Sequence, residues 1–176
     1  RRHATASQDL PENTVALLHF GRSGSGLMHS LIDSHPEIST LPAVYLRGYF
    51  NAGVWSEITA EGWRRLPERF VDLYAVLFDA NSPQPVPSRL GEETSHLGRE
   101  EGMTVVGENR DEALSLDKEA FCAAAHLLMK GYEKIDPASF FKVIHGAYEK
   151  VLDTKTQKKT IFYHIHNPDE YATLNF

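Results

Sequence analysis

A short apolar run from Thr14 to Phe20 leads directly into the glycine- and serine-rich segment Gly21–Gly26. The run contains β-branched residues and is followed at once by turn residues, which predicts a buried strand. Apolar residues then recur at helical spacing from Leu27 to Ile32, so a helix should begin near Gly26 and end at His35-Pro36. This order of strand, turn and helix indicates an α/β fold.

The remainder of the chain is read mainly as helix. The pattern predicts helices over 67–78, 117–130 and 136–151, a loop over 81–98, a second strand over 160–166 and a last helix after Asn167-Pro168. The expected fold is a P-loop-like parallel sheet flanked by helices, with a long mainly helical insertion, in a single domain over 1–176 that starts with a loose segment, 1–13. Two strands are few for a parallel sheet, which favours a chain that is the N-terminal portion of a longer protein.

Composition excludes several classes of protein. The net charge is −6 without a run of like charges, so nonspecific nucleic-acid binding, which needs clustered Lys and Arg, is not expected. Cys122 is the only cysteine and cannot form an intrachain disulfide. No apolar run is long enough to span a bilayer, and no signal sequence opens the chain. We therefore expect a cytoplasmic protein without a membrane span.

The segment Gly21–Gly26 has the chemistry of a phosphate cradle. Its glycines let the backbone bend closely around an anion, and the following helix adds N–H donors and a partial positive charge. Gly21 and Gly26 match the outer glycines of the nucleotide P-loop, G-x-x-x-x-G-K-[ST]. Leu27 and Met28 stand where that motif has Lys and Ser or Thr, so the groups that reach the terminal phosphates and hold Mg²⁺ are missing.

The loop and the residues after it resemble those of sulfotransferases that use 3′-phosphoadenosine-5′-phosphosulfate (PAPS). That family has a (Lys or Arg)-Ser-Gly-(Ser or Thr)-(Ser or Thr) loop between a strand and a helix, and Arg22–Gly26 matches it except at Gly26. The sequence Asp33-Ser34-His35-Pro36 is typical of the branch with bacterial and Golgi-type members. The resemblance covers Gly21–Pro36.

The resemblance implies a role for each residue of the loop. Arg22 would contact the 5′-phosphate and the sulfuryl oxygens, and the Ser25 hydroxyl would hold the phosphate. Backbone N–H groups would complete the PAPS site, from Ser23, Gly24, Ser25, Gly26 and Leu27. In-line sulfuryl transfer stabilises charge on the leaving phosphate and needs a general base but no metal, so we expect PAPS as co-substrate and no metal cofactor.

The general base is sought in the second strand. In the Golgi-type branch it is a glutamate a few residues after His-Pro, but Glu37 is too close to match and 38–44 contains no carboxylate. The cytosolic branch uses a histidine in a Lys-Thr-His-Leu-Pro segment, which Tyr163–Pro168 resembles. His166 would then be the base and His164 would take the lysine's place. Alternate strand residues share a face, so the two should point the same way.

Other interpretations of these histidines stay open. They could be ordinary polar residues near a helix cap, or a paired-histidine metal site, although no further ligand has obvious spacing. In another register His166 replaces the arginine, and Leu174 the serine, of the family's 3′-phosphate segment. Both key groups would then be missing, so the first register is preferred and the 3′-phosphate site is expected outside this chain. If His166 is not the base, Glu108 and His145 are the next candidates.

The sequence therefore predicts an enzyme, a PAPS-dependent sulfotransferase that acts on a hydroxyl or amine. Its acceptor would be a small molecule, a glycan or a lipid. Two alternatives belong to other classes: a P-loop-type nucleotide-binding kinase relative, and a noncatalytic interaction module that keeps a relic phosphate loop. A simple glycine turn is the plainest interpretation, but turn chemistry alone requires neither Arg22 nor the Asp-Ser-His-Pro sequence that follows.

Overall fold

The computed structural model describes residues 10–42, 46, 49–82 and 108–165, and these divide into two compact units. Among the described residues, the first unit holds 10–41 and 119–165, and the second holds those between 42 and 118. Residues 1–9 of the predicted loose segment 1–13, residues 83–98 of the predicted loop 81–98 and the predicted last helix after Asn167-Pro168 lie outside the described residues.

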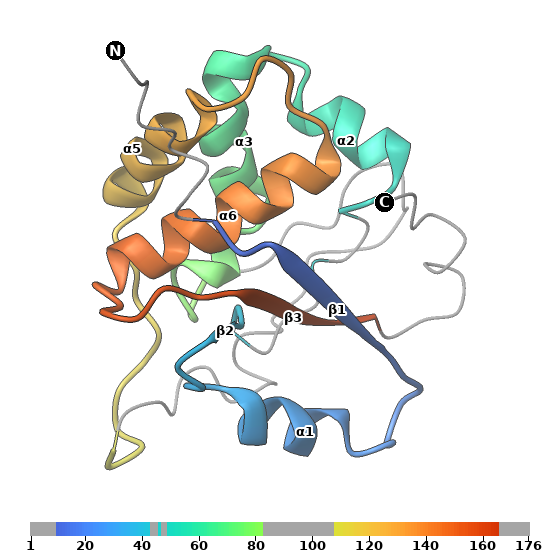
Figure 1. Cartoon of the computed structure of the whole chain (residues 1–176), viewed down its shortest axis with the longest axis vertical. Helices are drawn as coiled ribbons and strands as arrows, with labels where there is room; N and C mark the ends of the chain where they lie inside the picture. Colours follow the sequence, from blue (N-terminus) through green and yellow to red (C-terminus); the bar gives the residue numbers. More distant parts are fainter. Residues whose placement is uncertain (1–9, 43–45, 47–48, 83–107, 166–176) are drawn as a thin grey trace. The chain divides into compact units, whose positions relative to one another are not determined.

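The first unit contains a small parallel sheet. Its strands are β1 (Asn13–Leu18), β2 (Ile38–Ser39) and β3 (Thr160–Ile165), and β3 lies between the other two (Figure 1). Val15 pairs with Phe162, and Ile38 pairs with Thr160. The α/β prediction and both predicted strands are confirmed. Only β2 was not expected, since two residues give no recognisable strand pattern.

Helices cover both faces of this sheet. They are α1 (Ser25–Ile32) and α6 (Pro137–Val151), which Figure 1 shows on opposite sides of the strands. A further helix, α5 (Lys118–Met129), precedes α6 in the chain. Successive residues of β3 point to opposite faces. The Tyr163 ring packs edge-on against Phe141 of α6, with centroids 5.0 Å apart, whereas His164 meets α1.

The core of the first unit explains why α5 and α6 form where the sequence predicts them. Most of the α5 and α6 side chains on the predicted apolar stripes are buried, and Ala124 and Val151 are half-buried. The buried set, with Phe140 and inward residues of β3, comprises Phe121, Ala125, Leu128, Phe140, Phe141, Ile144, Tyr148, Ile161 and Ile165. Removing these apolar surfaces from water is the main favourable term in folding. Asp136 caps α6 as expected, because its Oδ1 accepts a hydrogen bond of 2.7 Å from the Ser139 N–H.

The second unit is helical. It contains α2 (Ala52–Ile58), the short 3₁₀ helix η2 (Trp63–Arg65), α3 (Leu66–Leu73) and the 3₁₀ helix η3 (Ala75–Leu77). Its core is aromatic: Phe70 meets Tyr49 and Phe78 edge-on, each with centroids 6.3 Å apart, and lies 5.0 Å from Tyr74. Such edge-on pairs add to the stability that burial provides.

The predicted helix over 67–78 is interrupted. Tyr74 has φ −116° and ψ 42°, outside the helical region, so α3 ends at Leu73 and a separate turn of 3₁₀ helix follows. Beyond it, the Leu116 N–H donates to the Phe78 carbonyl and Asp79 bridges Ser115, so the chain is already extended there. The side-chain periodicity was right, since Phe70, Tyr74 and Leu77 are all buried. Periodicity alone did not reveal the break in the backbone.

Of the helices that the structure describes, none combines the length and apolar character that crossing a membrane requires.

Candidate functional site

The glycine loop lies between β1 and α1, at the carboxyl end of β1. The Ser23 N–H donates to the Phe20 carbonyl over 3.3 Å, which closes a tight turn. Arg22 (φ 61°) and Gly24 (φ 82°) on either side of Ser23 have left-handed backbone angles. A glycine adopts this conformation without strain, whereas an arginine does so rarely. Alternation of backbone handedness is how turns direct successive N–H groups toward an anion.

The first turn of α1 presents its amides outward. The helical bonds start with Met28, whose N–H donates to the Gly24 carbonyl over 3.1 Å. The N–H groups of Ser25, Gly26 and Leu27 precede that bond and have no acceptor within α1. No side chain caps this end, and no acidic residue lies in the first turn. These three donors and the helix dipole are therefore available to an anion.

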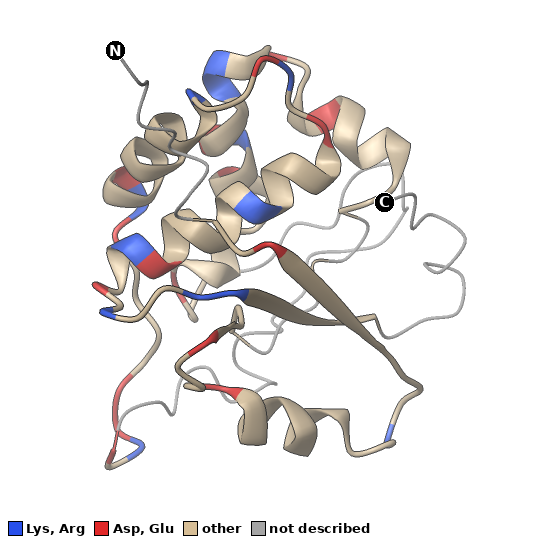
Figure 2. Ribbon diagram, in the orientation of Figure 1, with Lys and Arg blue, Asp and Glu red and all other residues tan. Residues whose placement is uncertain are grey.

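The loop is open to solvent and has one cation. Arg22, Ser23, Gly24 and Gly26 are exposed, and a Cβ at Gly24 or Gly26 would meet no atom within 4 Å. In Figure 2 the ribbon shows the blue of a basic residue in the turn between β1 and α1, while α1 carries no charge colour until its end. The loop thus combines an exposed arginine with exposed glycines whose Cβ positions are open.

His164 lies behind this loop instead of on the surface. It is 9% exposed, and its Nε2 is 2.6 Å from Nδ1 of His29. His29 is a residue of α1 and is 6% exposed. The sequence analysis did not single out His29, and only its helical position beside the loop could have suggested it. His19, which follows β1, completes the group: it is 5% exposed, and its ring centroid is 5.5 Å from that of His164.

Burial keeps two of these imidazoles neutral. Desolvation, together with a smaller effect of the neighbouring His29 and His19, lowers the pKa of His164 to about 4. Desolvation also lowers the pKa of His29, although Asp33 on the same helix opposes the shift. At neutral pH His164 therefore occupies the expected place of a lysine without a lysine's charge.

The structure does not place His166, because this residue lies outside the described residues. The structure does describe Glu108 and His145, the next candidates for the general base. Glu108 lies in an exposed turn of the second unit. His145 is completely buried in α6, and burial lowers its pKa to about 3, so its ring cannot reach a substrate on the surface.

His145 takes part in a buried chain of polar groups. The Ser39 hydroxyl donates to Glu149 Oε1 over 2.7 Å, and its oxygen lies 2.9 Å from His145 Nδ1. Since the single hydroxyl proton goes to Glu149, the imidazole must donate to Ser39. The serine therefore stands between the histidine and the acid, whereas a nucleophilic triad has the histidine in the middle. The arrangement joins β2 to α6 and does not activate Ser39.

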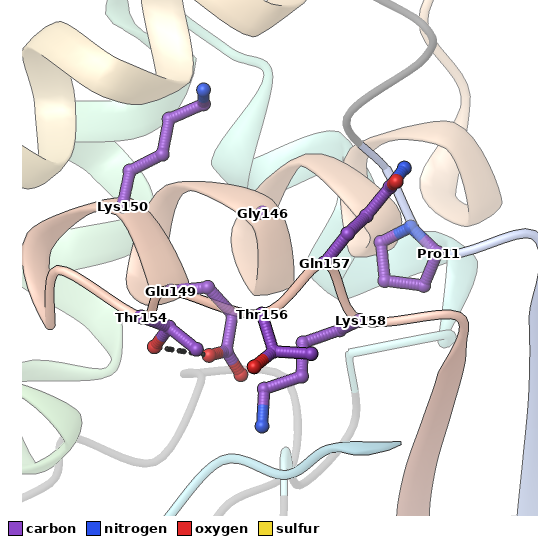
Figure 3. A pocket seen from close by; sticks show the side chains of 8 residues that line it. All are labelled: Pro11, Gly146, Glu149, Lys150, Thr154, Thr156, Gln157 and Lys158. Atoms are coloured by element: carbon purple, nitrogen blue, oxygen red, sulfur yellow. Dashed lines mark hydrogen bonds between the residues drawn. The ribbon is translucent and has the colours of Figure 1, made fainter. Parts of the chain in front are cut away.

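A cavity of about 270 Å³ lies next to Glu149, the last of these polar groups, at the end of α6 (Figure 3). Its lining comprises Pro11, Gly146, Glu149, Lys150, Thr154, Thr156, Gln157 and Lys158. Residues 154–158 precede β3, and Pro11 precedes β1, so the cavity lies at the amino edge of the parallel sheet. The glycine loop follows the opposite, carboxyl edge, where open α/β sheets bind ligands. We therefore take the loop, and not the cavity, as the candidate site.

Two further findings bear on the site. Among the residues that the structure describes, no group of three or more His, Cys, Asp and Glu side chains is arranged to hold a metal ion. No family model, curated protein or solved structure matches this chain. The candidate site therefore rests on its own geometry and on the sequence of the loop.

The three histidines with a lowered pKa predict that acid destabilises the fold. Above pH 6.5 His29, His145 and His164 are neutral in both folded and unfolded chains. Below pH 6.5 the unfolded chain takes up protons that the folded chain does not, so the free energy of unfolding decreases as the pH is lowered. The contribution of His164 levels off near pH 4, where its ring also takes up a proton in the folded chain. The expected slope is about 1.4 kcal/mol per pH unit for each histidine.

Urea unfolding at pH 7, 6 and 5 measures this slope. His145→Gln should lower the slope by about 1.4 kcal/mol per pH unit, the contribution of one proton, because one buried imidazole is removed. Asp79 and Asp136, whose pKa values are lowered, act in the same direction but only below their ordinary value of 3.8. A free energy of unfolding that stays constant from pH 7 to pH 5 would contradict the prediction.

Proposed function

We propose that the chain is part of a PAPS-dependent sulfotransferase and that the glycine loop binds the 5′-phosphosulfate. The observation that carries the proposal is the loop itself: the exposed Arg22 lies in the turn that leads into three amides without a helical acceptor at the start of α1, and a side chain at Gly24 or Gly26 would begin in open space. This is the environment that a transferring sulfuryl group and its leaving phosphate need. The small parallel sheet would then be the start of a P-loop-like fold.

The same geometry makes the kinase alternative weaker. Leu27 and Met28 are exposed apolar side chains at the positions where Lys and Ser or Thr would serve ATP and Mg²⁺. Sulfuryl transfer requires neither group. In the proposed reaction the acceptor oxygen or nitrogen forms a bond to the PAPS sulfur, the bond from sulfur to the 5′-phosphate oxygen breaks, and the acceptor proton goes to a base. The leaving group is adenosine 3′,5′-bisphosphate.

The remaining roles follow the sequence analysis. His166 is the proposed base. His164 was proposed for the place beside the sulfuryl group, but its burial leaves little of its surface for direct contact. A hydroxyl or amine of a small molecule, glycan or lipid is the proposed acceptor, and a cytoplasmic location remains a prediction. A noncatalytic module with a relic loop is distinguished by its failure to bind either nucleotide.

Arg22→Ala should weaken the binding of adenosine 3′,5′-bisphosphate by about 1.5–3 kcal/mol, since a charge-assisted hydrogen bond is lost. Isothermal titration calorimetry measures the change, and Arg64→Ala, which removes an exposed arginine of the second unit, is the matched control. Unchanged affinity in Arg22→Ala would remove this residue from the site. A wild-type chain that is stabilised by ATP–Mg²⁺ and not by the bisphosphate would favour the kinase relative.

Gly26→Ser should strengthen that binding, because it restores the hydroxyl that the resembling family has at this position. The new Cβ meets no atom within 4 Å, and Gly26 does not have a positive φ. The control is the same change two residues earlier. Gly24→Ser also has space, but φ is 82° there, so we expect a loss of about 1–3 kcal/mol in folding stability. Weaker bisphosphate binding by a stably folded Gly26→Ser variant would contradict the proposed contact.

His166→Ala should reduce turnover by about 10²–10⁴ and leave PAPS affinity nearly unchanged, because a base contacts the acceptor and not the nucleotide. The measurement is sulfuryl transfer with the acceptor in a protein that contains this chain. Full turnover in the variant would show that the base is another residue. Loss of activity on exhaustive chelation, restored by Zn²⁺, would instead favour the paired-histidine metal site.

A further inference from the structure

Three histidines from three different elements meet behind the glycine loop. His19 follows β1, His29 lies in α1 and His164 lies in β3, and each is at least nine-tenths buried. The His29 and His164 rings are 4.7 Å apart between centroids, and their facing nitrogens are 2.6 Å apart. Phe162 provides an apolar ring 6.3 Å from His29. Polar side chains gathered in such an environment are costly unless they bond to one another.

The cluster is attached to both ends of the loop. His19 Nδ1 lies 3.3 Å from the Phe20 carbonyl, the same oxygen that accepts the Ser23 N–H and closes the turn. A carbonyl only accepts, so the imidazole donates. His29 lies one helical turn beyond the amides at the start of α1. The entry and exit of the loop are thus both held by rings that meet His164.

The bond between His29 and His164 needs one proton between the two facing nitrogens. With both rings neutral, one supplies its N–H and the other its lone pair, so the two must adopt complementary tautomers. If each facing nitrogen carries a proton, both are donors and the hydrogen bond is lost. The pair is therefore a link that acid can open.

We propose that His29 and His164 are positioning residues of the glycine loop: their hydrogen bond holds α1 against β3 and so fixes the direction of the amides at its start. The anion-binding role of those amides rests on the proposed function, whereas the link itself does not. His164 acts on the loop through His29 and not by touching a substrate. This gives His164 a role that agrees with its burial.

The groups that face the pair set the direction of its pH response. Asp33 of α1 favours the charged form of His29, and Thr40 donates to that carboxylate over 2.6 Å. His19, at the end of β1, and His29 itself disfavour the charged form of His164. Burial outweighs the Asp33 contribution for His29, so the link persists at neutral pH. Acid weakens it, because the rings take up protons more readily once α1 separates from β3 than while they are buried.

The test measures hydrogen-exchange protection of the bonded α1 amides from Met28 to Asp33 in the protein without ligand. His29→Leu and His164→Leu should each lower this protection by about tenfold, because each leaves one buried nitrogen without its partner. The double variant should lose less α1 protection than the two single variants lose together, since neither imidazole then remains buried without its partner. His145→Leu is the matched control, because it removes an equally buried histidine from α6 and should leave α1 protection unchanged relative to α6.

His164→Gln distinguishes positioning from simple support of the fold. Its amide can donate or accept but does not titrate near neutral pH, so α1 protection should be close to wild type at pH 7. It should then fall less steeply toward pH 5 than in wild type, because His29 is the one member of the pair that still takes up a proton. The α6 amides serve as the internal reference for global destabilisation. Wild-type protection of α1 in both leucine variants, or the same decline toward pH 5 in His164→Gln as in wild type, would overturn the proposal.

Binding of adenosine 3′,5′-bisphosphate to the same variants separates this inference from the proposed function. If the wild type binds the bisphosphate and His164→Leu binds it about tenfold more weakly, the proposed function and the positioning role of the histidines are both supported. If α1 loses protection in the single variants but the wild type does not bind the probe, the link is supported and the proposed function fails. If the leucine variants bind the probe as well as wild type does, the two histidines do not position the loop.

Discussion

The hydrogen bond between His164 and His29 joins the central strand of the sheet to the helix that follows the glycine loop, and it exists only while one proton lies between the two rings. The loop's own residues are mostly exposed, and Gly24 and Gly26 have no atoms within 4 Å of where a side chain would begin. A segment with so few packing contacts depends on the elements at its two ends for its direction. Any anion chemistry at the loop therefore depends on a polar contact that is itself buried.

The loop's electrostatics come from the backbone and from one side chain. The neutral histidines behind it do not add positive charge at neutral pH, so Arg22 and the three amides at the start of α1 supply the positive potential. Backbone donors are fixed by the helix, which means that they need no reorganisation when charge develops on a bound group. A charged cluster behind the loop would attract anions more strongly, but burying it would be far more costly. The structure combines a neutral support with an exposed cation.

Local signals in the sequence predicted the elements but not the links between them. The strand at Thr14, the loop, the capped start of α6 at Asp136 and the strand at Thr160 follow from nearby residues, and the structure has each of them. The partner of His164 is 135 positions away on another element, and that of Ser39 is 106 positions away. Neither pair has a spacing rule, because tertiary packing alone brings the residues together. The same limit explains why the sequence did not reveal that His164 is buried against His29.

Two buried histidines attach helices to the sheet on its two sides. His29 of α1 bonds to His164 of β3, and His145 of α6 donates to Ser39 of β2. Apolar contacts tolerate small shifts of a helix along a strand, whereas a hydrogen bond of 2.6–2.9 Å does not. In a sheet with three strands among the described residues, these polar contacts would fix the register of helices that apolar packing alone leaves less well defined. A requirement for register is also a reason for polar groups to be kept in this core, since apolar residues of similar size could fill the same space.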